Sequence, residues 1–115
     1  MAQKKSVNIS TCCAFDKFCE ACFANLDADK RVALKTKFLK EPISKILEDS
    51  ELYDSLKAFF ANNLNISETS RNTFVHRNTL VYRLDKIQKL TGLDARNFED
   101  AVCMRLFMWI KSREN

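Results

Sequence analysis

Apolar side chains recur at helical spacing along most of this 115-residue sequence. Gly92 and Pro42 are the only glycine and proline in the chain. Because apolar residues at positions i, i+3, i+4 and i+7 share one side of a helix, each such run predicts a helix that packs on a core. A β protein of this size would need many more turn residues. The sequence therefore predicts an all-α fold in one domain's length of chain, too short to hold a large catalytic cleft beside its core.

Two helices are expected before Pro42. The first has an apolar face that repeats over residues 15–26, and Asp27 is positioned to cap the second. Residues 7–13 alternate weakly between apolar and polar side chains, which is a strand pattern without a partner strand. We therefore expect residues 1–46 to form an N-terminal helical segment, separate from a second domain at residues 47–115.

Three more helical segments are expected after Pro42. Ser50 is a suitable N-cap for a helix that ends near residues 62–63. A helix of only two turns is expected over residues 68–73, and a longer one over 77–90, with Gly92 as its stop. The short helix has small side chains on its inner side, so a second helix can cross it closely.

Positive charge is concentrated in the last two of these helices. Residues 71–89 contain five Arg or Lys and one acid, Asp85, so their surplus equals the chain's net charge of +4. A basic stripe on one helical segment is typical of proteins that bind the phosphate backbone of nucleic acids. A solvated helix face is the alternative interpretation of charge alone.

A short helix, a tight turn and a longer basic helix form the helix-turn-helix arrangement, whose second helix enters the major groove of DNA. In the first turn of that helix, Arg77 can pair with guanine, Asn78 with adenine, and Thr79 can meet a thymine methyl group. These three residues are expected to read bases. The residues expected to position the helix on DNA or to lie near its backbone are Arg71, His76, Tyr82, Arg83, Lys86 and Lys89.

Two runs of residues, 65–70 and 74–87, resemble the C-terminal helix-turn-helix domain of PucR/CdaR-type regulators, the family of purine-catabolism and sugar-diacid regulators. The stretch from His76 to Leu84 is the most specific part. The resemblance extends back to Leu52 and forward through the helix after Phe98. This region is also similar to the DNA-binding end of the nucleoid protein Fis. The resemblance implies a helical bundle with a Fis-like helix-turn-helix and an N-terminal helical extension.

The same resemblance implies a sequence-specific transcription regulator that binds double-stranded DNA, without catalysis, metal or cofactor. Residues 18–47 resemble, more weakly, the tail of the sensor domain that precedes this module in the family. We therefore expect an effector ligand to bind a sensor domain absent from this chain. A cytoplasmic, nucleoid-associated protein is expected.

The last apolar segment, Ala101 to Ile110, carries apolar residues almost all round. Such a helix is expected to be buried, either in its own domain or against a second copy of the chain. Because helix-turn-helix proteins commonly bind two half-sites as symmetric dimers, a homodimer is expected. A protein-interaction or dimerisation module that leaves the basic helix unused is the alternative function.

The cysteines and the single histidine support other functions less well. Cys19 and Cys22 share the apolar face of the first helix, where buried thiols behave as small hydrophobic groups, so we expect them to be reduced and packed. The alternatives are a zinc site that also uses Cys12 and Cys13, or a redox sensor with a reversible bond between Cys19 and Cys22. His76 has no Ser, Cys or Asp arranged around it in a triad pattern, so no catalytic role is expected.

Overall fold

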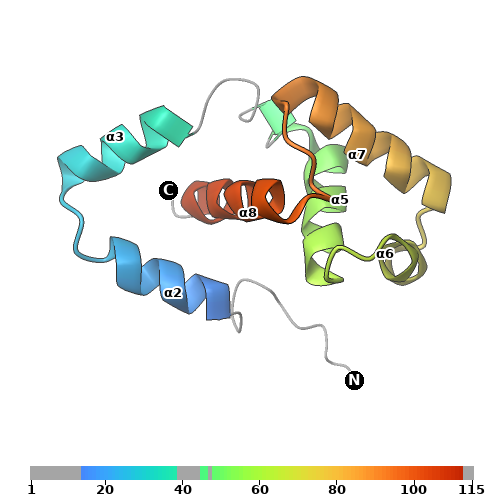
Figure 1. Ribbon diagram of the computed structural model, residues 1–115, viewed down its shortest axis with the longest axis horizontal. Coiled ribbons are helices and arrows are strands. Elements are labelled where there is room, and N and C mark those ends of the chain that lie inside the picture. The colour runs from blue at the N-terminus through green and yellow to red at the C-terminus, as the bar shows by residue number, and fades with distance from the viewer. Residues whose placement is uncertain (1–13, 39–44, 47, 113–115) are drawn as a thin grey trace. The chain divides into compact units, whose positions relative to one another are not determined.

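The structure is a computed structural model, which describes residues 14–38, 45–46 and 48–112 (Figure 1). Within those ranges it contains six helices and no strand, so the expected all-α class is confirmed. The helices are α2 (Ala14–Phe23), α3 (Ala28–Phe38), α5 (Ser50–Ala61), α6 (Ile66–Thr73), α7 (Arg77–Thr91) and α8 (Phe98–Ser112). None of the described helices is long and apolar enough to cross a membrane. The strand pattern at residues 7–13 and the helix break at Pro42 fall outside the described residues.

The chain divides into two compact units, Met1–Phe38 and Leu39–Asn115. This division comes earlier than the boundary expected after residue 46, and Ile46 belongs to the core of the second unit. In the first unit, α2 and α3 are the two expected helices. As expected, the Asp27 carboxylate caps α3 by accepting a hydrogen bond of 2.8 Å from the Lys30 amide.

The prediction that both cysteines of α2 are packed holds for one of them. Cys19 is buried, whereas Cys22 is exposed, as is Phe18 on the same helix. A run of apolar residues gives a helix an apolar face, but how much of that face is covered depends on its neighbours. The expectation that Cys22 packs in a core is therefore wrong.

The core of the second unit is built from α5, α7 and α8. These three helices each present an apolar face to it, and α6 closes one side through the partly buried Ile66. Its buried members are Ile46, Leu52, Leu56, Phe59, Leu80, Leu84, Ile87, Ala95, Met104 and Met108. The core thus holds one side of α7 and leaves the other side to solvent.

The start of α5 corrects the prediction of Ser50 as its N-cap. Asp49 has the extended backbone of a cap (φ −88°, ψ 105°), and its carboxylate accepts hydrogen bonds from the amides of Glu51 and Leu52. Ser50 is the first helical residue. A carboxylate at the helix N-terminus also meets the positive end of the helix dipole, which favours Asp49 as the cap. The end of α5, just before Asn62, is as expected.

Candidate nucleic-acid interface

The short helix α6 begins two residues earlier than expected and is held by its own small polar side chains. Asn65 caps it by accepting a hydrogen bond of 2.8 Å from the Glu68 amide. Thr69 is completely buried, and its hydroxyl donates to the Asn65 carbonyl at 2.7 Å. Because this side chain is small and its hydroxyl is satisfied, α7 can cross α6 closely at this point.

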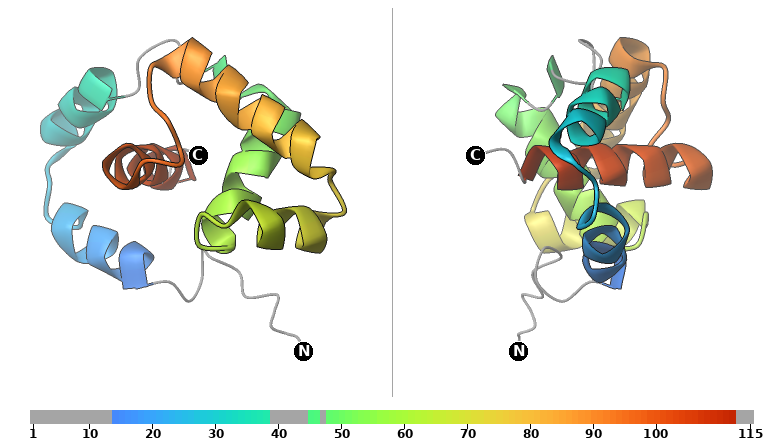
Figure 2. Two further views of the ribbon diagram at one scale, coloured as in Figure 1. Left: turned by 45° about the vertical axis from the view of Figure 1, so that its right-hand side comes forward. Right: turned by 90° about the vertical axis from the view of Figure 1, so that its left-hand side faces the viewer.

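The turn between α6 and α7 is locked by one side chain. The Ser70 hydroxyl donates to the Val75 carbonyl at 2.6 Å, and Val75 packs on the edge of the core. Phe74, between them, has the left-handed conformation (φ 59°) and ends α6. The two helices are steeply inclined: α6 is seen almost end-on in Figure 1 while α7 runs across the view, and Figure 2 shows the turn from another side.

His76 is the N-cap of α7. Its Nδ1 atom accepts a hydrogen bond of 3.1 Å from the Asn78 amide. The side chain therefore satisfies one of the amides that a helix start leaves unpaired. At the other end, Gly92 takes the left-handed conformation (φ 80°), and its amide donates to the Gln88 carbonyl at 2.7 Å. The glycine stop expected from the sequence is thus present.

One side of α7 is buried and the other is exposed. Leu80, Leu84 and Ile87 are in the core. Arg83 is partly buried, whereas all the other residues of α7 expected to meet DNA are exposed: Arg77, Asn78, Thr79, Tyr82, Lys86 and Lys89. They lie on a continuous polar surface because the buried and exposed positions alternate with the helical period.

Arg77 is exposed but oriented by α6. One terminal nitrogen of its guanidinium donates to the Ser67 hydroxyl at 2.7 Å. A guanidinium has five N–H donors, so this contact leaves others available to a ligand. On α6 itself, Arg71 pairs with Glu68 at 2.8 Å, and both side chains are at least half exposed.

Arg83 makes its contacts inside the unit. Its guanidinium donates to the Ser55 hydroxyl at 3.0 Å and lies 3.9 Å from the Glu51 carboxylate, both on α5. These contacts join the middle of α7 to α5. The sequence predicted a role for Arg83 in placing the helix on DNA and gave no sign of these partners.

Arg96, in the segment between α7 and α8, was not identified from the sequence. Its guanidinium lies 2.8 Å from the carboxylates of both Asp85 and Asp94, and 3.3 Å from the Gln88 side-chain oxygen. The hydrogen bond to Asp94 is the main reason that the pKa of Arg96 is raised. Burial raises the pKa of Asp94, but the hydrogen bonds and charge of Arg96 outweigh it, so this pKa is lowered. The spacing of Asp94 and Arg96, two residues apart, could have indicated a local ion pair from the sequence. The contact with Asp85 joins the loop to the preceding helix, and no local sequence pattern indicates it.

No group of three or more His, Cys, Asp or Glu side chains that could hold a metal ion occurs in the described ranges. Cys12 and Cys13, which the alternative zinc site would use, lie outside them. Of the described cysteines, Cys22 and Cys103 are exposed and Cys19 is buried.

Comparison with known proteins gives one family match, the PucR C-terminal helix-turn-helix domain, over residues 52–110. The Carbohydrate diacid regulator of Escherichia coli (strain K12) is 48% identical over 50 residues, which are 44% of this chain and 13% of that protein. The Purine catabolism regulatory protein of Bacillus subtilis (strain 168) is 35% identical over 68 residues, 59% of this chain and 13% of that protein.

A third relative, the protein YsfB of Bacillus subtilis (strain 168), is 32% identical over 80 residues, which are 70% of this chain and 22% of that protein. The chain therefore spans less than a quarter of the length of each of these relatives. No solved structure matches the chain. Because the family match covers more than half of the sequence, from Leu52 in α5 to Ile110 in α8, this chain belongs to the PucR C-terminal helix-turn-helix domain family.

Proposed function

We propose that this chain binds double-stranded DNA through α7 and acts as the sequence-specific DNA-binding part of a transcription regulator. The observation that carries the proposal is the exposed polar face of α7, which projects from a helix whose opposite face is fixed in the core. Two relatives, named Carbohydrate diacid regulator and Purine catabolism regulatory protein, support the same function.

The proposed roles follow the position of each residue along α7. Arg77, Asn78 and Thr79 are in its first turn, the part of a recognition helix that meets base edges. Tyr82, Lys86 and Lys89 follow on the exposed side and suit contacts with the DNA backbone. The exposed Arg71, in the last turn of α6, and His76, the N-cap of α7, also suit contacts near the DNA backbone.

Arg83 has a different role in this proposal. Because its guanidinium is engaged by Ser55 and Glu51, it positions the recognition helix by holding α7 against α5. Contacts with phosphates then fall mainly to Lys86 and Lys89.

We also propose that the protein binds DNA as a homodimer through α8. Ala101, Met104 and Met108 are buried on this helix, while Val102 and Cys103 are exposed one position away. Two exposed apolar side chains on a largely buried helix suit contact with a second copy, and two copies would bind two half-sites. In a longer protein, an effector would act on this module through a separate sensor domain.

Selection of bound duplexes from a random pool tests the DNA-binding proposal. We expect the protein to enrich one short motif, and the variant Asn78→Ala to bind the enriched duplex more weakly than the parent. Lys57→Gln, a charge change at a half-exposed site on α5, is the control and leaves the enriched motif unchanged. Retention of all duplexes alike, or of none, would contradict sequence-specific binding.

A further inference from the structure

One acidic side chain lies in the middle of the surface proposed to meet DNA. At about 100° per residue, Asp85 falls on the same line along α7 as Asn78, Tyr82 and Lys89. Its side chain is 55% exposed. A bare carboxylate at this point would repel the phosphates that Lys86 and Lys89 are proposed to bind, because like charges oppose close approach.

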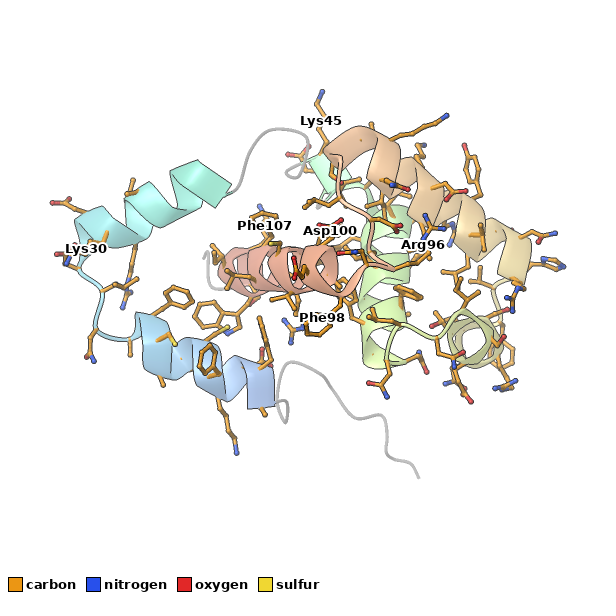
Figure 3. All side chains as sticks on the ribbon, in the orientation of Figure 1. Lys30, Lys45, Arg96, Phe98, Asp100 and Phe107 are labelled. Carbon is orange, nitrogen blue, oxygen red and sulfur yellow. The ribbon has the colours of Figure 1, made fainter. Side chains whose placement is uncertain are left out.

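Arg96 reaches this carboxylate from outside the helix-turn-helix. It comes from the segment between α7 and α8 and is labelled beside α7 in Figure 3. Its terminal nitrogen lies 2.8 Å from the Asp85 carboxylate and 3.3 Å from the Gln88 side-chain oxygen, one turn further along the same helix. Arg96 therefore contacts side chains on two successive turns of α7.

The arginine is itself held in place by Asp94. The Asp94 carboxylate accepts hydrogen bonds from the Arg96 amide at 3.0 Å and from its Nε atom at 2.8 Å. The Asp94 amide in turn donates to the Asp100 carboxylate at 3.0 Å, which fixes the loop to the start of α8. The Arg96 side chain is only 28% exposed, so it is a fixed group and not a freely moving surface arginine.

We propose that Arg96 is a positioning residue of the DNA interface, which holds and neutralises the Asp85 carboxylate so that α7 can approach the phosphate backbone. This inference rests on the proposed DNA-binding function. Arg96 acts through Asp85 and does not need to touch DNA. The segment after α7 thus contributes to recognition from beyond the two helices that define the motif.

The proposal predicts a specific pattern of DNA affinities. Arg96→Gln keeps a polar side chain but removes the positive charge, which leaves Asp85 without its cation in the interface and Asp94 without its cation in the loop. A unit charge within about 10 Å of phosphates in a partly hydrated interface corresponds to a loss of roughly threefold to tenfold in affinity at low salt. The loss becomes smaller as salt is added, because the repulsion is screened.

The test is a double-mutant cycle at positions 85 and 96, measured by titration with the duplex selected from the random pool. We expect Arg96→Gln to bind about threefold to tenfold more weakly than the parent, as argued above from the unneutralised charge. Asp85→Asn should bind at least as well as the parent, and Arg96→Gln with Asp85→Asn should recover nearly all of the lost affinity. Lys57→Gln, which removes a positive charge from α5, should bind like the parent.

Each other outcome has a distinct meaning. If the double variant binds as weakly as Arg96→Gln alone, Arg96 acts by direct contact with DNA or by supporting the fold, and the proposal is overturned. Full affinity of Arg96→Gln also overturns it. Circular dichroism and thermal melting show that each variant is folded at the temperature of the titration. If the parent protein itself selects no duplex, the DNA-binding proposal fails instead.

Discussion

Arg77 and Lys89 lie at opposite ends of the exposed face of α7, and their removal is expected to change DNA binding in different ways. Arg77→Ala should cost about 1 to 3 kcal/mol on the preferred duplex and relax the choice of base at one position, because a bidentate contact is lost. Lys89→Ala should weaken all sequences alike and reduce the slope of log affinity against log salt by about one, because one phosphate contact disappears.

Titration of both variants with the preferred and a scrambled duplex at several salt concentrations separates these two effects. Each variant is the control for the other. Equal weakening of both duplexes by Arg77→Ala, or a changed base preference in Lys89→Ala, would mean that α7 is placed differently in the groove.

Asp94 gives a prediction for the pH dependence of stability. Arg96 holds the pKa of Asp94 below its ordinary value of 3.8, even though burial alone would raise it. A carboxyl group whose pKa is lower in the folded state stabilises the fold above the unfolded pKa, and this contribution is lost as the pH falls through the folded pKa. The contribution is therefore present at neutral pH and disappears below pH 3.8.

The variant Asp94→Asn checks this expectation by urea denaturation at pH 7 and pH 3. We expect the parent to exceed the variant in free energy of unfolding by up to about 1 kcal/mol at pH 7, since the pair is partly exposed, and the difference to shrink at pH 3. A difference that grows towards low pH would contradict the assigned interaction.

At the scale of helices and turns, the junction between α6 and α7 contains an unfavourable residue. Phe74 has the left-handed conformation (φ 59°) and is 94% exposed. A side chain with a Cβ atom is strained there, and glycine is the usual residue at such a helix end. We expect Phe74→Gly to raise the free energy of unfolding by roughly 0.5 to 1 kcal/mol, because relief of strain outweighs the added freedom of the unfolded chain.

Phe74→Ala is the matched control, because it removes the ring but keeps the Cβ atom and hence the strain. Its urea midpoint should stay close to that of the parent. If the glycine variant is less stable than the alanine variant, the ring itself supports the turn and the expectation is wrong.

At the scale of the whole molecule, the proposed homodimer makes a prediction about both mass and operator. Val102, 42% exposed on α8, is placed in the proposed contact. We expect a dimer in sedimentation experiments at micromolar concentration, and Val102→Glu to shift it towards monomer because a charge would be buried at the contact. Val32→Glu makes the same change at an exposed valine of α3 and should leave the mass unchanged.

The half-site spacing in the selected duplexes tests the proposed homodimer independently. Two recognition helices related by a two-fold axis reach major grooves about one helical turn apart, so paired half-sites should be separated by about 34 Å. A monomeric protein that selects a single half-site, with no dimer formed on DNA, would exclude this arrangement.

The sequence by itself determined the features that depend on neighbours within about four residues. The apolar periods predicted the helices of the second unit, and Leu80, Leu84 and Ile87 form the buried side of α7. Local capping groups predicted Asp27 at the start of α3 and Gly92 at the end of α7. These features follow from the helical repeat and from backbone hydrogen bonds, which are short in range. Where two residues suited to capping are neighbours in the sequence, as Asp49 and Ser50 are, the sequence pattern alone predicted the wrong N-cap.

Only the tertiary structure decided which charged side chains are paired across elements. Arg83 meets Ser55, 28 residues away, and Arg96 meets Asp85, 11 residues away. No periodic pattern signals such contacts, because they depend on how a loop or a second helix is packed. The sequence could therefore predict the exposed face of α7. The ion pair of Asp85, the one acidic residue of that helix, depends on where the loop before α8 places Arg96. The physical reason is that helix faces are set by local geometry, while ion pairs between elements form only after the core has packed.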